Sequence, residues 1–475
     1  MSSPATNLSV WERISLLLDL GSFEEFLAGV EYGGSENLRK RGDGVAAGLG
    51  EVDGRVVAVY AHDPTFLGGS LGEVGASKIA RLYEAAVKYG IPIIGLSDSS
   101  GARIHEGPSS LMAVGALFQA IRRAAGRIPQ ITAVLGGCVG GAAFSAAMGD
   151  LVVGCSGRGY IFLNGPAAVK KVVGGEVTVQ ELGGVDVLAR TSGMIDLLAR
   201  DEVEVIEKVK RLLSYLPSNN RELAPLETHE SSEADRPSKI SLKPEGSYDV
   251  REVVAEVFDR GSTLELQQFY APSMFTGLAR LNGIPVGVIA NQPLHNKGVI
   301  DFDAAVKLCR LVRLCSSFNL PIVTFVDTPG FAPGTEQEHR GIVRLGSQIF
   351  TAYIDALVPK VSVILGRAYG GGYIAMSSRG IGADYVIGLP SAEVSVLPPD
   401  LAAEIIYRKQ LDGMSEDSRI NALRERELEL RARYSGDALL TMGVVDKLVE
   451  PEEIRPTLAK VVQTLYARYG AQLTP

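Results

Sequence analysis

Two glycine-rich segments contain the residues whose types and spacing could do chemistry. Residues 134–148 read VLGGCVGGAAFSAAM, and residues 364–376 read ILGRAYGGGYIAM. In each, an apolar run predicts a strand, and the small residues after paired glycines predict a helix. The first N–H groups of a helix have no acceptor within the helix, and glycine lets a ligand oxygen approach the backbone closely. Such a corner can serve as an oxyanion hole or as a cradle for a phosphate.

The alternative interpretation is that these glycines only allow tight packing between strand and helix. Two loops at the same place in two halves of the chain favour a functional role over packing alone. Neither segment contains the GxxxxGK[ST] pattern, and neither is a strict GxGxxG followed by an acid that binds a ribose. The sequence therefore disfavours a nucleotide-binding fold. Two oxyanion holes that face one another would suggest a reaction with two enolate-like partners.

The sequence gives little evidence for a side-chain nucleophile or for metal ligands. Ser145 and Ser70 lie near the loops, but no histidine is evidently placed to activate either of them. The five histidines are scattered, without an HExxH motif or a pair at helical spacing, so we expect no metal. The four cysteines show no CxxC spacing and fall inside apolar stretches, which favours buried reduced thiols over disulfides or zinc ligands.

The two glycine segments belong to halves of the chain that repeat one another. Gly140 and Gly370 lie 230 positions apart. The segment IPIIGLSDSSG (91–101) resembles LPIVTFVDTPG (320–330), and DGRVVAVY (53–60) resembles NGIPVGVI (282–289), both at an offset of 229. Segments that recur in the same order at nearly one offset indicate a duplicated domain.

Each half is predicted to position its glycine corner with the same succession of elements. An [N/D]-G turn predicts an antiparallel hairpin, a stretch of helical period follows, and short apolar runs predict buried parallel strands. The expected ranges are hairpins in Val45–Tyr60 and Gly277–Ala290, helices in Ile79–Tyr89 and Ala304–Phe318, and strands in Ile91–Leu96, Ile131–Leu135, Ile322–Val326 and Val361–Leu365. This order predicts an α/β fold with right-handed crossovers. The polar, proline-bearing residues 217–247 are expected to link two domains, at 1–216 and 248–475.

Composition and charge argue against several classes of function. Of 475 residues, 47 are Lys or Arg and 55 are Asp or Glu, and the net charge of −8 disfavours nucleic acid as a partner. No apolar run reaches the roughly 18–20 residues that a membrane span needs. Residues 1–10 show neither a basic start nor an apolar segment, so we expect no secretory signal and a cytoplasmic location.

The motifs together resemble those of one known family, the carboxyltransferase (beta) subunits of biotin-dependent acyl-CoA carboxylases. Propionyl-CoA and acetyl-CoA carboxylase beta subunits belong to it, and the methylmalonyl-CoA decarboxylase alpha subunit is related. The matching segments are GSFEEF (21–26), DGRVVAVYAHDPTFLGGSLGE (53–73), SDSSGARIHEG (97–107), GGEVTVQELGG (174–184), ANQP (290–293), FVDTPGFAPGTEQE (325–338), VPKVSVILGRAYGGGY (358–373) and GADYVIGLPSAE (382–393). The resemblance implies tandem crotonase-like domains of the ClpP/crotonase superfamily, a duplicated ββα spiral.

The resemblance also implies a reaction and a role for each corner. In this family CO2 moves between N1 of carboxybiotin and the α-carbon of a short acyl-CoA. The first glycine pair, here Gly140 and Gly141, is expected to hold the thioester oxygen of the acyl-CoA enolate. The second, here Gly371 with Gly372 in place of the usual alanine, is expected to hold the ureido oxygen of biotin. No side-chain nucleophile is needed, because biotin freed of its carboxylate can take the α-proton.

Further residues are expected to contact the substrates or to shape their sites. Those expected to bind the acyl-CoA are Gly68, Gly69, Ser70 and Ala142. Arg103 is expected either to bind a CoA phosphate or to tie its loop to Asp98. Ile374 stands where propionyl-specific members carry Asp, which hints at a broader or different acyl preference. Asp327 ends a strand before a turn and is expected to be structural.

The resemblance also implies partner proteins, because this sequence lacks two motifs that the complete reaction needs. It has no AMKM-type biotinylation site and no ATP-grasp signature. Biotin is therefore expected on a separate carrier protein, with a biotin carboxylase as the second partner subunit. The family also forms hexamers built from dimers, in which each active site lies between the N-half of one subunit and the C-half of another.

Two departures from the family pattern keep other functions open. A glycine-bearing stretch of the relatives, near the biotin side, reads LPPDLAAEI here (397–405), with Pro398 and Leu401 at the glycine positions. Of a basic N-terminal segment, only VWERI (10–14) matches. A decarboxylase of malonyl- or methylmalonyl-type thioesters, with or without biotin, is one alternative. A non-catalytic assembly or regulatory paralogue is another.

Overall fold

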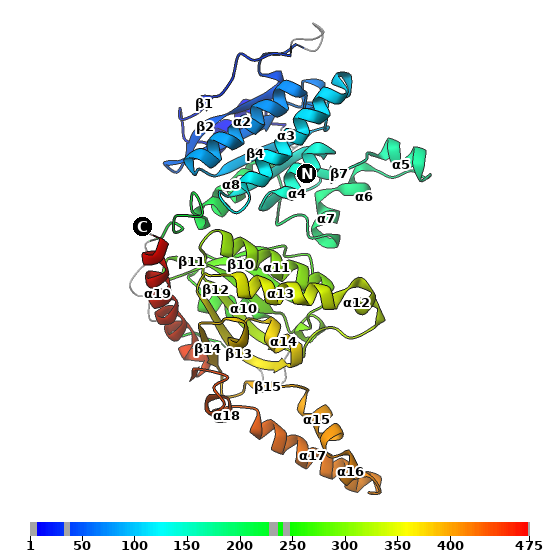
Figure 1. Ribbon diagram of the computed structural model, residues 1–475, viewed down its shortest axis with the longest axis vertical. Helices are drawn as coiled ribbons and strands as arrows, with labels where there is room; N and C mark the ends of the chain where they lie inside the picture. The colour runs from blue at the N-terminus through cyan, green and yellow to red at the C-terminus, as the bar shows by residue number, and fades with distance from the viewer. Residues whose placement is uncertain (1–6, 33–38, 228–235, 241–247, 474–475) are drawn as a thin grey trace, which may run out of the picture. The chain divides into compact units, whose positions relative to one another are not determined.

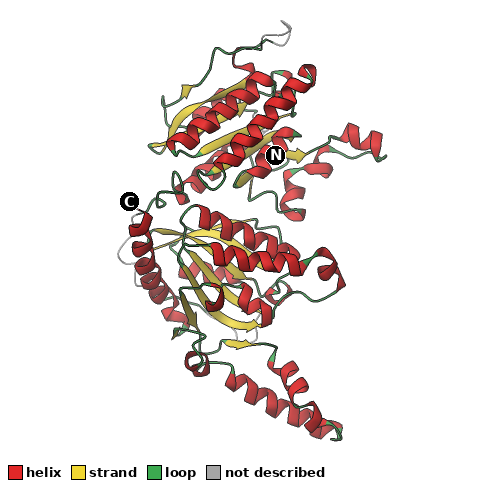
Figure 2. Cartoon of the chain, viewed as in Figure 1, coloured by secondary structure: helices red, strands yellow, loops and turns green. Residues whose placement is uncertain are grey.

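The protein consists of two compact units. The computed structural model describes residues 7–32, 39–227, 236–240 and 248–473. Unit 1 is Met1–Ala224 and unit 2 is Pro225–Pro475 (Figure 1). The division falls inside the predicted linker 217–247, of which residues 228–235 and 241–247 lie outside the described part of the chain. Each unit contains one mainly parallel sheet with helices packed against it (Figure 2).

The sheet of unit 1 begins with an antiparallel hairpin and continues with parallel strands. In spatial order its strands are β1 (Glu24–Glu25), β2 (Val45–Val52), β3 (Arg55–His62), β4 (Ile93–Ser99), β5 (Gln130–Val139), β6 (Leu151–Cys155) and β8 (Leu197–Ala199), and β7 (Tyr160–Phe162) pairs with the far end of β5. The pairs β1–β2 and β2–β3 are antiparallel, and the others are parallel.

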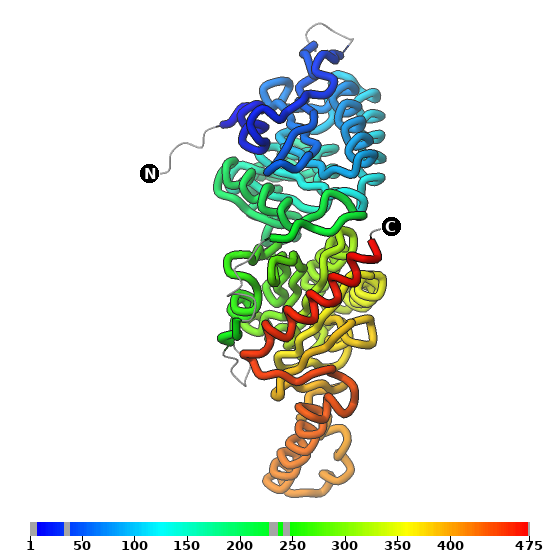
Figure 3. Tube along the Cα trace, turned by 90° about the vertical axis from the view of Figure 1, so that its left-hand side faces the viewer, coloured from blue at the N-terminus to red at the C-terminus, as the bar shows by residue number. Residues whose placement is uncertain are grey.

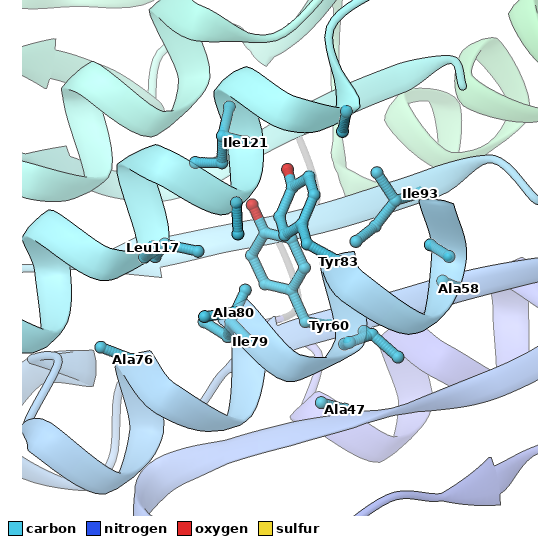
Figure 4. Packing of buried hydrophobic residues seen from close by; sticks show 14 of the residues in the cluster. Ala47, Ala58, Tyr60, Ala76, Ile79, Ala80, Tyr83, Ile93, Leu117 and Ile121 are labelled. Carbon is cyan, nitrogen blue, oxygen red and sulfur yellow. The ribbon is translucent and has the colours of Figure 1, made fainter. Parts of the chain in front are cut away.

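Two long helices cover one face of this sheet and enclose its core. The helices of unit 1 are α1 (Val10–Leu17), α2 (Glu73–Tyr89), α3 (Pro108–Ala124), α4 (Gly141–Met148), α5 (Pro166–Val172), α6 (Val179–Gly183), α7 (Val185–Thr191) and α8 (Glu202–Tyr215). Tyr60 of β3 and Tyr83 of α2 meet inside this core, with ring centroids 6.2 Å apart (Figure 4). Ile79 of α2 and Leu117 and Ile121 of α3 pack around them. Burial of these apolar side chains fixes the sheet against which the first glycine corner forms.

The sheet of unit 2 repeats the arrangement. In spatial order its strands are β16 (Lys447–Leu448), β14 (Tyr385–Gly388), β13 (Lys360–Tyr369), β12 (Ile322–Thr328), β11 (Ile284–Asn291), β10 (Met274–Leu281) and β9 (Leu264–Leu266), and β15 (Glu393–Ser395) pairs with the far end of β13. Its helices are α10 (Val250–Val257), α11 (Phe302–Ser317), α12 (Thr335–Arg340), α13 (Ile342–Asp355), α14 (Gly370–Ala375), α15 (Pro399–Ile406), α16 (Arg408–Leu411), α17 (Glu416–Arg433), α18 (Asp437–Thr441) and α19 (Ile454–Leu473). The long α19 runs along the outside of this unit (Figure 3), and α15 to α17 project from it (Figure 1).

The predicted elements are present in both halves, so the α/β fold is confirmed. The hairpins β2–β3 and β10–β11 turn at Asp53–Gly54 and Asn282–Gly283, the dipeptide type that two-residue hairpin turns prefer. Strands β5 and β13 run four residues beyond the predicted ends at Leu135 and Leu365. They continue because β7 and β15 pair with their last three residues, and short strands that return from later in the chain leave no local signal.

The sequence also predicted buried reduced cysteines and no membrane-spanning segment. All four cysteines are buried and free. Within the part of the chain that the structure describes, none of the helices is both long enough and apolar enough to cross a membrane.

Candidate functional site

The first glycine corner joins β5 to α4. Gly140 has φ 54° and ψ −113°, a combination that only glycine adopts readily, and its own N–H donates to the carbonyl oxygen of Phe162 at 3.1 Å. The next residues, Gly141 and Ala142, begin the helix, so their N–H groups have no acceptor within it, and no side chain caps them. The geometry thus makes Gly140 the turning point and offers the N–H groups of Gly141 and Ala142 to a ligand.

The second corner joins β13 to α14. Gly370 has φ 54°, as Gly140 does, and it opens a helix that no side chain caps. A Cβ on Gly371 would touch the ring of Phe331 at 3.4 Å. A Cβ on Gly372 would lie 2.7 Å from the Cα of Gly330, which no real Cβ tolerates, so the alanine usual in the family does not fit here unless the backbone moves.

A buried aspartate supports each corner from the neighbouring strand. Asp98, near the end of β4, accepts a hydrogen bond from the N–H of Gly137 at 3.1 Å, and Asp327, near the end of β12, accepts one from the N–H of Arg367 at 3.2 Å. The strand pairing shifts register at both aspartates. Asp98 also forms a 3.0 Å ion pair with Arg13. These contacts agree with the structural role expected for Asp327.

In unit 2 the side chain of Arg367 also contacts Asp327, the aspartate that supports the second corner. Nε of Arg367 lies 2.8 Å from Oδ1 of Asp327, and the hydroxyl of Tyr248 donates to Oδ2 of Asp327 at 3.2 Å. Burial raises the pKa of Asp327, against the opposing effect of Arg367. The aspartate thereby links the segment before α10 to the strand that carries the second corner.

The predicted acyl-CoA loop lies against the first corner. Residues Leu67–Gly69 form the short helix η3, and a Cβ on Gly69 would lie 2.1 Å from the carbonyl oxygen of Asp98. Gly68 is exposed, whereas Gly69 and Ser70 are buried. The following segment is close as well, because a Cβ on Gly101 would lie 2.8 Å from the carbonyl oxygen of Val139. The carboxyl ends of β3, β4 and β5 therefore meet at one place.

Arg103 is held inside the protein by carboxylates of unit 1. Its side chain is 1% exposed, and Nη1 lies 2.6 Å from Asp43 and 2.7 Å from Glu106. Nη2 donates to the carbonyl oxygen of Ser70 at 2.9 Å. The expected partner Asp98 is not among these contacts, and a guanidinium so enclosed cannot also face a phosphate in solvent. We therefore assign Arg103 to positioning the predicted acyl-CoA loop rather than to binding a ligand.

Sequence reasoning overlooked a histidine behind the first corner. His62 is buried, and a cavity of about 10 Å³ is lined by His62, Ala142, Ser145 and other residues. Burial lowers the pKa of His62 to about 4. Within the described residues neither ring nitrogen has a hydrogen-bond partner, and the hydroxyl of Ser145 donates to the carbonyl oxygen of Gly141 at 3.0 Å. The two side chains do not form a nucleophile–base pair.

Sequence reasoning also missed the counterpart of the acyl-CoA loop in unit 2. Residues Asn296–Gly298 form η5, and a Cβ on Gly298 would lie 2.5 Å from the carbonyl oxygen of Asp327, as at Gly69. The carbonyl oxygen of Lys297 accepts a hydrogen bond from Arg367 at 3.2 Å. The signal was available, because the offset of 229 places Lys297 opposite Gly68 and Gly298 opposite Gly69.

Two other features border the second corner. Ile374 of α14 is 41% exposed. The carbonyl oxygen of Val396 would lie 3.1 Å from a Cβ on Gly370, and Pro398 and Pro399 then begin α15. The prolines that depart from the family pattern thus occupy the start of a helix, where a missing N–H removes no helical hydrogen bond.

Comparisons with known proteins cover almost the whole chain. Residues 2–471 match the family of the carboxyl transferase domain. The chain is 40% identical to a propionyl-CoA carboxylase carboxyltransferase subunit of Haloferax mediterranei, over 97% of this chain and 91% of the relative. It is also 40% identical to a methylmalonyl-CoA decarboxylase subunit alpha of Veillonella parvula, over 96% of this chain and 90% of the relative.

A solved structure gives the same result. The transcarboxylase 12S hexamer, crystallised with methylmalonyl-coenzyme A and methylmalonic acid, superposes with a TM-score of 0.93 at 36% identity, over 97% of this chain and 90% of that chain. The predicted resemblance to carboxyltransferase subunits is confirmed, and so is the prediction that the chain is an enzyme. By sequence and by structure, the chain belongs to the carboxyl transferase family.

Proposed function

We propose that this carboxyltransferase exchanges CO2 between the α-carbon of a short acyl-CoA, of the propionyl or acetyl type, and N1 of biotin on a separate carrier protein. The observation that carries the proposal is the pair of corners at Gly140 and Gly370, which have the same φ of 54° in two repeated units. In the decarboxylating direction the Cα–carboxylate bond breaks and the N1–carboxylate bond forms, while the N1 proton passes to Cα. The electron pair is held meanwhile as an enolate.

The first corner is proposed to stabilise that enolate. Gly140 sets the turn, and the N–H groups of Gly141 and Ala142 donate to the thioester oxygen as it gains charge. Each such donor is worth roughly 3–4 kcal/mol in the transition state of comparable enzymes. Gly68, Gly69 and Ser70 form the wall along which the acyl-CoA lies, with Arg103 holding that wall in place.

The second corner is proposed to hold the ureido oxygen of biotin. Its donors are the N–H groups of Gly371 and Gly372, near the start of a helix that no side chain caps. Biotin supplies an amide-like nitrogen that can carry the carboxylate. We assign the exposed side chain of Ile374 to contact with the bound groups beside this corner. Supporting observations are the absence of side chains at both glycines and the close approach of Gly330, which the glycine at 372 permits.

The fold and partners of the family complete the proposal. We assign both units to the crotonase-like fold and propose a homo-hexamer in which corners from different subunits face one another, as the hexameric transcarboxylase relative suggests. The biotin carrier and a biotin carboxylase are the proposed partner subunits. No metal is assigned a role, and the described residues contain no group of three or more His, Cys, Asp or Glu that could hold one.

A direct test incubates the purified chain with malonyl-CoA or methylmalonyl-CoA, with and without biotin methyl ester, and follows the thioesters by mass spectrometry. Biotin-dependent loss of CO2 supports the proposal and ranks the acyl groups. Loss without biotin favours a simple thioester decarboxylase. That second candidate is kept because a methylmalonyl-CoA decarboxylase subunit is among the relatives at 40% identity. No loss in the presence of either thioester contradicts both.

A further inference from the structure

A lysine at the edge of the second corner adopts a backbone conformation that disfavours it. Lys297 has φ 56° and ψ 22°, in the left-handed region where an L side chain is strained. The corresponding residue of unit 1 is Gly68, with φ 64° and ψ 26°, which suffers no such strain. Since the same turn forms with glycine, the backbone alone does not require a lysine at this position.

The charge of Lys297 is not balanced locally. Its side chain is exposed, and within the described residues its ammonium group takes part in no ion pair. The neighbouring cation, Arg367, forms an ion pair with Asp327 and donates to the carbonyl oxygen of Lys297 at 3.2 Å. The carboxylate of Asp327 is already used by Arg367 and Tyr248, and the described residues show no carboxylate paired with Lys297. The surplus positive charge is free to attract an anion.

The same contacts place Lys297 at the edge of the sheet where the corner forms. Arg367 lies on β13, three residues before Gly370. Gly298, next to Lys297, approaches the carbonyl oxygen of Asp327 closely, and Ile300 pairs with Phe331, which contacts the position of a Cβ on Gly371. The turn of Lys297 is therefore joined to the corner through two independent packing contacts.

We propose that Lys297, held by Arg367, binds the carboxylate that is exchanged at the second corner. The inference rests on the proposed function, because that function brings a carboxylate to this place. A protonated amine attracts a carboxylate by charge and by hydrogen bonding, whereas it gains far less from an uncharged ureido ring. Lys297 forms no covalent bond in this role. It therefore favours the carboxylated over the uncarboxylated form of the carrier group.

Equilibrium binding to the full-length protein tests this without needing turnover. The probes are biotin methyl ester and its analogue with a carboxymethyl group on N1, a stable mimic of the carboxylated form. We expect Lys297→Gln to weaken binding of the carboxymethyl analogue about tenfold and to change binding of the plain ester less than twofold. The esters contain no valerate carboxylate, and free biotin as a third probe shows whether Lys297 binds that group instead.

Relief of strain provides the matched control. Lys297→Gly removes the strained side chain, so its melting temperature is expected to rise by about 2 °C while binding of the analogue weakens as in Lys297→Gln. Asn296 of the same turn also has a positive φ, of 47°. Asn296→Gly is expected to change stability little, because asparagine tolerates this conformation, and to leave binding of the analogue unchanged. Loss of affinity with gain of stability is a combination that a purely structural role for Lys297 does not produce.

The outcomes separate the inference from the function on which it rests. If Lys297→Gln binds both esters as the wild type does, the inference is wrong even where carboxyl transfer to biotin methyl ester is observed. If only free biotin loses affinity in the variant, Lys297 binds the valerate carboxylate and the inference is again wrong. If the wild type transfers no carboxyl group to the ester, the proposed function fails, whatever the binding data show.

Discussion

The carboxylate of Asp98 accepts a hydrogen bond from the backbone N–H of Gly137 at 3.1 Å, three residues before the first glycine corner begins. The same oxygen lies so close to Gly136 that a Cβ there would be 2.1 Å away. Asp327 occupies the corresponding place beneath the second corner. Each corner is therefore fixed by a side chain on the adjacent strand rather than by its own sequence alone.

Replacing Asp98 with alanine is expected to destabilise the protein by about 3–5 kcal/mol, because the N–H of Gly137 and one side of Arg13 lose a buried acceptor. Urea unfolding measures the change. Glu84→Gln, on the exposed face of α2, is the control and should shift stability by less than about 0.5 kcal/mol. Equal stability of the Asp98 variant and the control would mean that the corner does not depend on this aspartate.

Replacing Gly140 with alanine is expected to lower the rate of carboxyl transfer about 100-fold or more without unfolding the protein. A Cβ at Gly140 meets no atom within 4 Å, so the effect comes from the backbone rotation, which turns the N–H groups of Gly141 and Ala142 away from the substrate oxygen. Steady-state kinetics measures the rate, and circular dichroism measures the fold. Gly157→Ala, also at positive φ (70°) with no atom within 4 Å, is the matched control and should retain activity.

Replacing Arg103 with lysine is expected to cost about 3 kcal/mol of stability. Lysine keeps the charge but cannot bridge Asp43, Glu106 and the carbonyl oxygen of Ser70 at once, so at least one buried acceptor is left unpaired. Thermal unfolding compares the variant with Arg200→Lys, whose guanidinium is largely exposed. If Arg103→Lys is as stable as the control but binds acyl-CoA more weakly, the arginine is a ligand after all.

Stability in the range from pH 7 to pH 9 is expected to depend on Lys307. Burial lowers the pKa of this lysine to about 7, and among the described residues its ammonium donates only to the carbonyl oxygen of Tyr270, at 2.8 Å. Its folded pKa is below its unfolded value of about 10.4, so the unfolded chain binds the proton more tightly and stability rises with pH. Between pH 7 and pH 9 the free energy of unfolding is expected to rise by about 2 kcal/mol.

The measurement compares urea unfolding of the wild type and Lys307→Met at several values of pH. The difference between their stabilities should change in favour of the wild type as pH rises. Lys78 of α2 corresponds to Lys307 in the repeat, but it has a carboxylate partner, Glu25, at 2.9 Å. The residue that corresponds to Glu25 in unit 2, Glu265, is paired with Arg251 instead. Parallel pH profiles of the wild type and Lys307→Met would contradict the prediction.

The sequence alone predicted those helices and strands that the internal repeat and the hydrophobic periodicity indicate. The repeat and the residue patterns were sufficient for both hairpins, for α2 and α11, and for β4 and β12, although these two strands run beyond the predicted ends at Leu96 and Val326. The helices α3 and α13 were not predicted. The first corner was correct in place, but the contact of Gly140 with Phe162 was not foreseeable, because β7 returns from 20 residues later to pair with β5. Hydrogen bonds made by a distant strand leave no local pattern.

Side-chain partners were less predictable than elements. Arg103 was expected either to bind a CoA phosphate or to reach Asp98, which is close in sequence. Its carboxylate partners are instead Glu106 and Asp43, and Asp43 is 60 residues away. His62 was overlooked because nothing in the sequence signals which face of a strand borders a small cavity. Lys297 could have been found by extending the repeat alignment into the turn after β11, since the offset already places it opposite Gly68.

The donors proposed at both corners belong to the main chain, and this has an evolutionary consequence. A catalytic side chain can be lost through many codon changes, whereas every amino acid except proline brings an N–H to the same position. Natural selection therefore acts at Gly140 and Gly370 on the absence of a side chain and on the backbone dihedral angle φ. After duplication, the two copies could keep this shared core and still diverge at its border, where one now carries a glycine at 68 and the other a lysine at 297.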